Sequence, residues 1–240
     1  MTVYFLIPVY NEEGNIPALF NDLVNALQEE NKFYLFVDDH STDNTIDLIK
    51  KTFSNTSFTI LEKEKNYGPG HSFNMGFEWI LKNSADDSDI IVTMEADTTS
   101  DISILPLMKA VSDLGYELVL ASVYAQGGGF ERTNFFRKVI SFFANMLFRF
   151  FYNVKVLTLS SFYRIYHISL LKKIKEKYPV LISENGFICM LEILMKAVKV
   201  EACIIEVPMK LKSDKREGTS KMKILKNMLQ YFRFLFFKKL

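Results

Sequence analysis

Short runs of β-branched and aromatic residues alternate with helical patterns through the first 125 residues of this 240-residue chain. The strand-like runs are Val3 to Val9, Phe33 to Val37, Phe58 to Leu61, Ile90 to Met94 and Glu117 to Ser122. Helical patterns lie between them, at residues 15–30, 44–53, 70–82 and 102–114. This alternation is the sequence form of βαβ units, so it predicts an α/β fold with a mainly parallel central sheet flanked by helices.

Length and composition narrow the class of protein further. A chain of 240 residues predicts one large domain or a domain with an appendage, and 49% hydrophobic against 24% charged residues exclude a disordered chain. The net charge is only +1, whereas nucleic-acid-binding domains are typically strongly basic, so the charge does not favour nucleic-acid binding. Cys189 and Cys203 lack CxxC spacing, which favours a reducing compartment. With no leader and no apolar run of about 18 residues, we expect a soluble or peripheral protein.

Phenylalanine is concentrated in two stretches, residues 134–153 and 220–239, which hold 11 of the 22 Phe. In each stretch the polar residues recur every three or four positions, leaving an apolar face wider than the ~100° that a surface helix normally buries. Two interpretations stay open. The stretches are core helices of a small appendage, or amphipathic helices that face a membrane, where Lys and Arg meet anionic lipid.

Polar segments follow the first two predicted strands, where open α/β sheets bind ligands. The first reads Ile7-Pro8-Val9-Tyr10-Asn11-Glu12-Glu13, and the second reads Val37-Asp38-Asp39-His40-Ser41-Thr42-Asp43-Asn44-Thr45. The carboxylate of Asp39 can accept a hydrogen bond from a nucleobase N–H. Ser41 or Thr42 could instead cap the helix that follows.

A glycine-containing turn, Lys65 to Gly76, enters the third predicted helix. Its glycines let backbone approach a ligand, but Phe73 stands where a dinucleotide fingerprint needs Gly, and the P-loop GK[ST] is absent. A second glycine-rich segment, Gly127 to Gly129, is typical of a mobile loop.

Two acids, Glu95 and Asp97, come directly after the fourth predicted strand and flank Ala96. Because they are two residues apart in an extended segment, both side chains point to the same side of the chain. Two carboxylates plus a diphosphate make a plausible Mg²⁺ or Mn²⁺ site, since these hard cations take carboxylate and phosphate oxygens. The alternative is a solvated loop that carries two acids by chance.

Together, these four segments in this order resemble the family 2 glycosyltransferases with a GT-A (nucleotide-diphospho-sugar transferase) fold. The resemblance implies a metal-dependent hexosyltransferase in which Glu95 and Asp97 hold Mg²⁺ or Mn²⁺. It implies a nucleotide site made of Pro8, Tyr10, Glu12, Asp38, Asp39, Asn66, Gly68, Gly70 and Ala96.

The second half of the chain looks like the dolichyl- or polyprenyl-phosphate mannose or glucose synthases. Their ending resembles the segment Arg216-Glu217-Gly218-Thr219-Ser220-Lys221, and the resemblance covers about residues 3 to 225. The chain departs from the family pattern at four places: Glu95 replaces the first Asp of DAD, Thr99 replaces a Gln, Val123 replaces an Arg, and residues 158–164 lack an acid and a Gly.

The resemblance implies inverting transfer of a hexose from a GDP- or UDP-sugar to polyprenyl phosphate at a membrane surface. The resemblance also implies that Asp97 takes part in catalysis. The cations expected to bind the phosphates are Arg132, Arg137, Arg164, Arg216 and Lys221. Saccharide-acceptor relatives commonly carry a Glu-Asp pair where this chain has Glu184-Asn185, which favours a phosphate acceptor, although Glu184 could still act as a base.

We therefore expect one GT-A domain over residues 1–240, with a nucleotide-sugar half (1–125), an acceptor half (126–218) and an amphipathic C-terminal helix (219–240). The protein is expected on the cytoplasmic face of a membrane, with a possible membrane-spanning partner and no nucleic acid. Two alternatives remain: a family 2 transferase acting on a cell-surface saccharide or glycolipid, and a non-catalytic sugar-nucleotide-binding protein.

Overall fold

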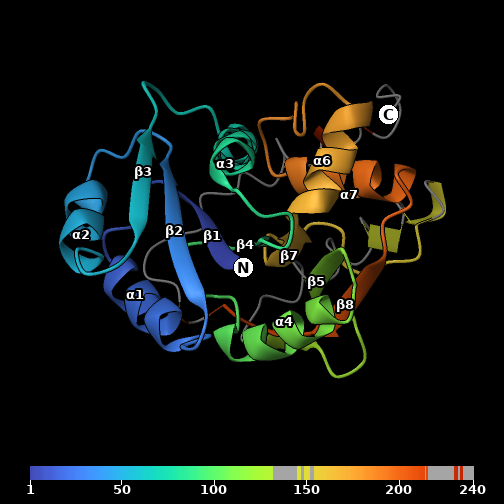
Figure 1. The fold of residues 1–240 in the computed structure, drawn as a ribbon, viewed down its shortest axis with the longest axis horizontal. Helices are drawn as coiled ribbons and strands as arrows, with labels where there is room; N and C mark the ends of the chain where they lie inside the picture. The colour runs from blue at the N-terminus through green and yellow to red at the C-terminus, as the bar shows by residue number, and fades with distance from the viewer. Residues whose placement is uncertain are drawn as a thin grey trace.

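A seven-stranded sheet forms the centre of the molecule (Figure 1). The computed structural model describes residues 1–131, 145–146, 149–151, 154–213, 215, 230–231 and 233–234. The strand order is β3-β2-β1-β4-β7-β5-β8. The strands are β1 (Thr2–Val9), β2 (Asn31–Asp38), β3 (Phe58–Glu62), β4 (Ile90–Thr93), β5 (Leu118–Ser122), β7 (Arg164–His167) and β8 (Ile204–Pro208). β7 is antiparallel to β4 and β5, and the other pairs of neighbours are parallel, which confirms the predicted mainly parallel sheet.

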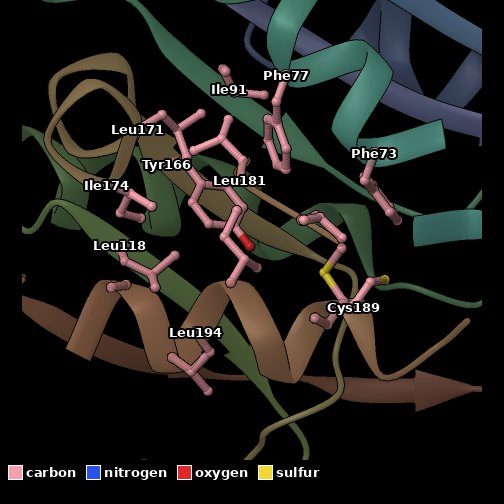
Figure 2. Packing of buried hydrophobic residues seen from close by; sticks show 14 of the residues in the cluster. Phe73, Phe77, Ile91, Leu118, Tyr166, Leu171, Ile174, Leu181, Cys189 and Leu194 are labelled. Atoms are coloured by element: carbon pink, nitrogen blue, oxygen red, sulfur yellow. The ribbon is translucent and has the colours of Figure 1, made fainter. Parts of the chain in front are cut away.

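Helices cover both faces of this sheet (Figure 1). They are α1 (Ile16–Asn25), α2 (Thr45–Thr52), α3 (Pro69–Asn83), η1 (Ile102–Ile104), α4 (Leu105–Asp113), α6 (Ile168–Lys177) and α7 (Cys189–Lys199). Alternation along β1 divides the core: Phe5 packs with α1, α2 and α4, whereas Leu6 packs with α3, α6 and α7. Figure 2 shows the second cluster, with Tyr166 of β7 lying among side chains of α3 and α7.

The first helix ends earlier than its pattern predicts, at Asn25 rather than near residue 30. Lys32 at the start of β2 donates hydrogen bonds to the carbonyls of Leu23, Val24 and Ala26 at 3.1, 2.8 and 2.8 Å. A cation on the last carbonyls stabilises a helix end, and Leu27 then turns the chain with a φ of 49°.

The segment after β5 differs from its sequence prediction. Gly129 begins a short strand, β6 (Gly129–Glu131), which pairs in parallel with β9 (Lys210–Lys212), so the predicted loop at Gly127 to Gly129 ends one residue earlier. The amide of Lys212 donates to the carbonyl of Thr99 at 2.9 Å. The second half of the chain is thereby tied to the loop that follows β4.

Strands from both predicted halves share the central sheet, because β7 lies between β4 and β5. The two phenylalanine-rich stretches are described only in part: residues 145–146, 149–151, 230–231 and 233–234 are helical. Within the described residues, no helix is both long enough and apolar enough to cross a bilayer.

Candidate active site

Backbone strain is concentrated at one edge of the sheet. β1, β2 and β4 are parallel, so the loops that follow them meet at their common carboxyl edge. Asn11, His40 and Thr98 lie in these loops and have φ of 52°, 69° and 56°. Positive φ is costly for non-glycine residues, above all for a β-branched one, and such strain gathers at functional sites. The same edge carries the polar segments singled out in the sequence.

Hydrogen bonds join the loops after β1 and β2. The amide of Asn11 donates to Ser41 Oγ at 2.9 Å, and the amide of Thr42 donates to Asn11 Oδ1 at 2.7 Å. The amide of Glu12 donates to Thr45 Oγ1 at 2.8 Å. Ser41 and Thr42 therefore connect the two loops. The N-cap position of α2 is Asn44, so the alternative in which Ser41 or Thr42 caps this helix is wrong.

The first acid of the second loop, Asp38, shapes the backbone. Its Oδ2 accepts from the amide of Ser41 at 2.9 Å and its Oδ1 accepts from Ser41 Oγ at 2.5 Å. Asp43, in turn, accepts from the amide of Thr45 at 3.0 Å in the first turn of α2. Both carboxylates hold the loop in place.

The second acid, Asp39, holds the glycine turn. Its oxygens accept from the amides of Tyr67 and Gly68, each at 2.8 Å, and Oδ1 lies 2.5 Å from Lys63 Nζ. Burial lowers the pKa of Lys63, and the neighbouring Asp39 only partly offsets this. An ionised carboxylate offers about four acceptor positions, so three donors leave one for a nucleobase N–H.

The glycines of this turn serve a purpose that the sequence did not reveal. Gly68 has a φ of +93°, and a Cβ on Gly70 would lie 1.8 Å from the carbonyl oxygen of Glu184. The amide of Gly70 also donates to the carbonyl of Asn185 at 2.8 Å. Gly70 thus admits another segment of the protein, rather than a ligand, against the start of α3.

A buried ion pair on α7 holds that approaching segment. Glu192, which is fully buried, accepts from the amides of Ser183 and Glu184 at 3.0 and 2.8 Å and from Lys196 Nζ at 2.8 Å. Burial raises the pKa of Glu192, but Lys196 and the hydrogen bonds from Ser183 and Glu184 outweigh it and hold the pKa below its ordinary value. The sequence signal was a Glu and a Lys four residues apart in a mostly apolar helix.

The acids after β4 lie at the same edge. Asp97 is 4% exposed, and its Oδ1 accepts from the amide of Thr99 at 3.1 Å and from Thr99 Oγ1 at 2.7 Å. Thr98 Oγ1 donates to the carbonyl of Lys215 at 3.4 Å, which brings the residue before Arg216 beside these acids.

The described residues contain no group of three or more His, Cys, Asp or Glu side chains able to hold a metal. Glu95 and Asp97 supply two carboxylate groups, whose oxygens are hard ligands. This donor set fits Mg²⁺ or Mn²⁺ when a diphosphate provides further oxygens.

The remaining predicted nucleotide residues also lie at or near this edge. Pro8 lies in β1 beside Val37 of β2, and Glu12 Oε2 accepts from Asn15 Nδ2 at 2.6 Å. Asn66 is exposed at the start of the glycine turn, and Ala96 is buried between the two acids.

Arg164 requires a correction. It is fully buried at the start of β7, and it donates to the carbonyls of Ser161, Leu159 and Met190 at 2.7, 2.8 and 2.9 Å and to Tyr166 Oη at 3.1 Å. Four protein acceptors engage a guanidinium that has five N–H groups. Arg164 joins the turn before β7 to α7, so the prediction that it grips a phosphate is wrong. The other predicted cations, Arg132, Arg137, Arg216 and Lys221, lie outside the described residues.

Comparison with known proteins assigns the family. The sequence profile of glycosyl transferase family 2 matches residues 4–175. The chain belongs to glycosyl transferase family 2.

Within that family it is 30% identical to a dolichol-phosphate mannosyltransferase of Pyrococcus furiosus over 98% of this chain and 63% of that protein. It is 26% identical to a polyprenol monophosphomannose synthase of Mycolicibacterium smegmatis, over 90% of this chain and 79% of that protein. The chain thus spans less than two thirds of the length of the Pyrococcus relative.

Solved structures confirm the GT-A type of α/β fold for this family 2 chain. Glucosyl-3-phosphoglycerate synthase from Mycobacterium tuberculosis, solved with Mn²⁺, uridine diphosphate and glucosyl-3-phosphoglycerate, superposes with a TM-score of 0.66 at 17% identity, over 98% of this chain and 77% of that one. Staphylococcus aureus TarS 1-349 with UDP-GlcNAc superposes with a TM-score of 0.63 at 21% identity, over 98% and 65% of the two chains.

Proposed function

We propose that this family 2 chain transfers a hexose from a nucleotide diphosphate sugar to polyprenyl phosphate with inversion at the sugar. One observation carries the proposal: Asp97 is buried in the loop after β4, at the edge where the strained loops after β1 and β2 meet. The names of the relatives supply the acceptor class, since they act on dolichol phosphate or polyprenol phosphate.

The donor lies across this edge in our proposal. The base contacts the glycine turn and Asp39, whose remaining acceptor position suits an N–H of uracil or guanine. Pro8, Tyr10 and Glu12 line the β1 side, and Asp38 holds the loop that carries Asp39. The diphosphate reaches Ala96 and the two acids that flank it.

Glu95 and Asp97 are the residues that would hold Mg²⁺ or Mn²⁺. When bound, such an ion supplies positive charge that stabilises the departing diphosphate. Thr99, which donates twice to Asp97 Oδ1, fixes the orientation of that carboxylate. The two structural neighbours solved with uridine nucleotides make a UDP-sugar the first donor to test, with GDP-sugars beside it.

The chemistry requires no general base. An oxygen of the acceptor phosphate forms a bond to the anomeric carbon, and the bond from that carbon to the diphosphate oxygen breaks. Because the phosphate monoester is already ionised, no proton has to be removed from the nucleophile. Asn185 instead of a second acid agrees with this, and its carbonyl is engaged by Gly70. Arg132, Arg137, Arg216 and Lys221 remain our proposed phosphate-binding cations.

Exposed aromatic side chains support a position at a membrane surface. Phe150 and Phe151 are 82% and 52% exposed, and Met146 is exposed beside them. By contrast, Phe234 in the second phenylalanine-rich stretch is 2% exposed and belongs to the core. The interfacial interpretation therefore suits the first stretch and the core interpretation suits Phe234. Peripheral binding to the cytoplasmic face, with or without a spanning partner, completes the proposal.

The test is a transfer assay that varies both substrates. Purified protein with Mg²⁺ or Mn²⁺ is offered UDP- and GDP-hexoses, and either short-chain polyprenyl phosphate, the matching polyprenol or a saccharide. We expect product with polyprenyl phosphate only, loss of product in Asp97→Asn, and unchanged product in Asp47→Asn on the exposed face of α2. Product with the saccharide alone would establish the alternative acceptor class, and nucleotide binding without transfer to any acceptor would establish a non-catalytic protein.

A further inference from the structure

The described helical residues 145–146 and 149–151 turn their polar side chains toward the protein. Asn145 is 8% exposed, whereas Phe150 on the same segment is 82% exposed. A surface helix of a soluble protein has the opposite arrangement, with apolar side chains inward and polar ones outward. The outward phenylalanines suit a membrane, but the inward polar side chains need a partner of their own.

Within the part of the chain that the structure describes, Asn145 has such a partner and the Nε of Arg149 does not. Asn145 Oδ1 accepts from the amide of Leu159 at 3.1 Å. Arg149 is half-buried, and its Nε is buried. Among the described residues, this Nε has no hydrogen-bond acceptor and the side chain forms no ion pair. Native proteins leave few buried polar atoms unsatisfied, and an unmet charged donor is among the most costly. An unpaired guanidinium N–H turned inward is therefore a sign of an absent anionic partner.

The chain that follows Arg149 reaches the carboxyl edge of the sheet. The amide of Val154 donates to the carbonyl of Arg149 at 3.3 Å, and Thr158, four residues further on, shares a 2.7 Å hydrogen bond with Ser122 at the end of β5. β5 runs in the same direction as β4, because β7 is antiparallel to both. The segment that carries Arg149 is thus fixed to the edge where the donor acids lie.

We propose that Arg149 binds the phosphate monoester of the acceptor, a proposal that rests on the function proposed above. The guanidinium matches phosphate oxygens in bidentate geometry, and it lies on the segment that turns Phe150 and Phe151 outward. One segment then binds both parts of an amphiphilic substrate. Its outer side meets the hydrocarbon region where the lipid chain lies, and its inner side receives the headgroup. Arg164 cannot take this role, because four protein acceptors engage it.

The test compares Arg149→Met with Lys155→Met, which removes an exposed charge six residues further along the chain. Short-chain polyprenyl phosphate is supplied in neutral detergent micelles without phospholipid. We expect the acceptor KM of Arg149→Met to rise about 10- to 100-fold, the range expected for a lost charge-assisted hydrogen bond. The donor KM and the melting temperature stay unchanged. Arg149→Lys restores part of the acceptor affinity, and Lys155→Met behaves like wild type.

The controls separate three ways in which the proposal fails. An acceptor KM within twofold of wild type in micelles, together with weaker flotation on anionic vesicles, would mean that Arg149 binds a phospholipid headgroup instead, which overturns the proposal. A lower melting temperature with both KM values raised would show a purely structural role. If wild-type protein transfers sugar to saccharides but never to polyprenyl phosphate, the proposed function falls, and the role of Arg149 falls with it.

Discussion

Replacing Gly70 with alanine should destabilise the protein, because Gly70 packs closely against the Glu184–Asn185 backbone. In Gly70→Ala the new Cβ would lie 1.8 Å from Glu184 O, so the two segments must move apart by about 1.2 Å to reach even 3.0 Å. That movement breaks the 2.8 Å hydrogen bond from the Gly70 amide to Asn185. Overpacking of a well-packed site is worth about 1–3 kcal/mol, and a lost hydrogen bond about 1 kcal/mol.

One effect acts in the opposite direction. Gly70 lies in the first turn of α3, and alanine favours a helix over glycine by about 0.5–1 kcal/mol. The net expectation is a loss of about 1–3 kcal/mol, a large part of the roughly 5–15 kcal/mol that stabilises a typical domain. Nucleotide affinity should also fall, because the glycine turn moves.

The assay is urea unfolding of Gly70→Ala beside Gly129→Ala, with nucleotide binding measured by calorimetry on both. A Cβ on Gly129 meets nothing within 4 Å, so this control should change the unfolding free energy by less than about 0.5 kcal/mol. If Gly70→Ala proves as stable as Gly129→Ala or more stable, the close packing of the turn against residues 184–185 is refuted.

Three further predictions concern buried charge and exposed apolar surface. Glu192→Gln should lower the unfolding free energy by about 3 kcal/mol near neutral pH, because Lys196 keeps a buried charge without its partner. Since the folded pKa of Glu192 lies below its ordinary 4.5, this stabilisation is complete above that pH and disappears as the pH falls through the folded pKa, so acid urea titrations should bring the two proteins together. Arg164→Lys should lose about 2–4 kcal/mol in the same unfolding assay, and an unchanged midpoint would contradict its structural role. The double variant Phe150→Ser, Phe151→Ser should reduce flotation on anionic vesicles at least about tenfold. The control Leu114→Ser, which changes a 79% exposed side chain at the end of α4, should not reduce it. Equal losses in the two variants would show that the phenylalanines have no special part in vesicle binding.

Periodicity was sufficient to predict the parallel part of the sheet. β1 and β5 were placed within one residue at each end because their residues are apolar on both faces and are bounded by turns. The order of polar segments at strand ends was sufficient to predict which edge carries the acids. Local sequence determines both features, so both can be read without knowledge of distant contacts.

Features that depend on distant contacts could not be predicted in this way. The burial of Arg164 results from carbonyls of three separate residues, and nothing in its own neighbourhood distinguishes it from an arginine that binds phosphate. The close approach at Gly70 depends on a segment more than 100 residues further along the chain. The short strand at Gly129 forms only because β9 lies beside it.

We propose that one edge of the sheet binds the activated sugar through the acids after β2 and β4. A crystal structure of the protein with a nucleotide diphosphate and Mn²⁺ tests it most directly. Our account predicts the base against the glycine turn near Asp39, and the diphosphate and metal at Glu95 and Asp97. Density for the nucleotide elsewhere, for example in the groove between α3 and α6 lined by Trp79, Lys82 and Lys172, would contradict it.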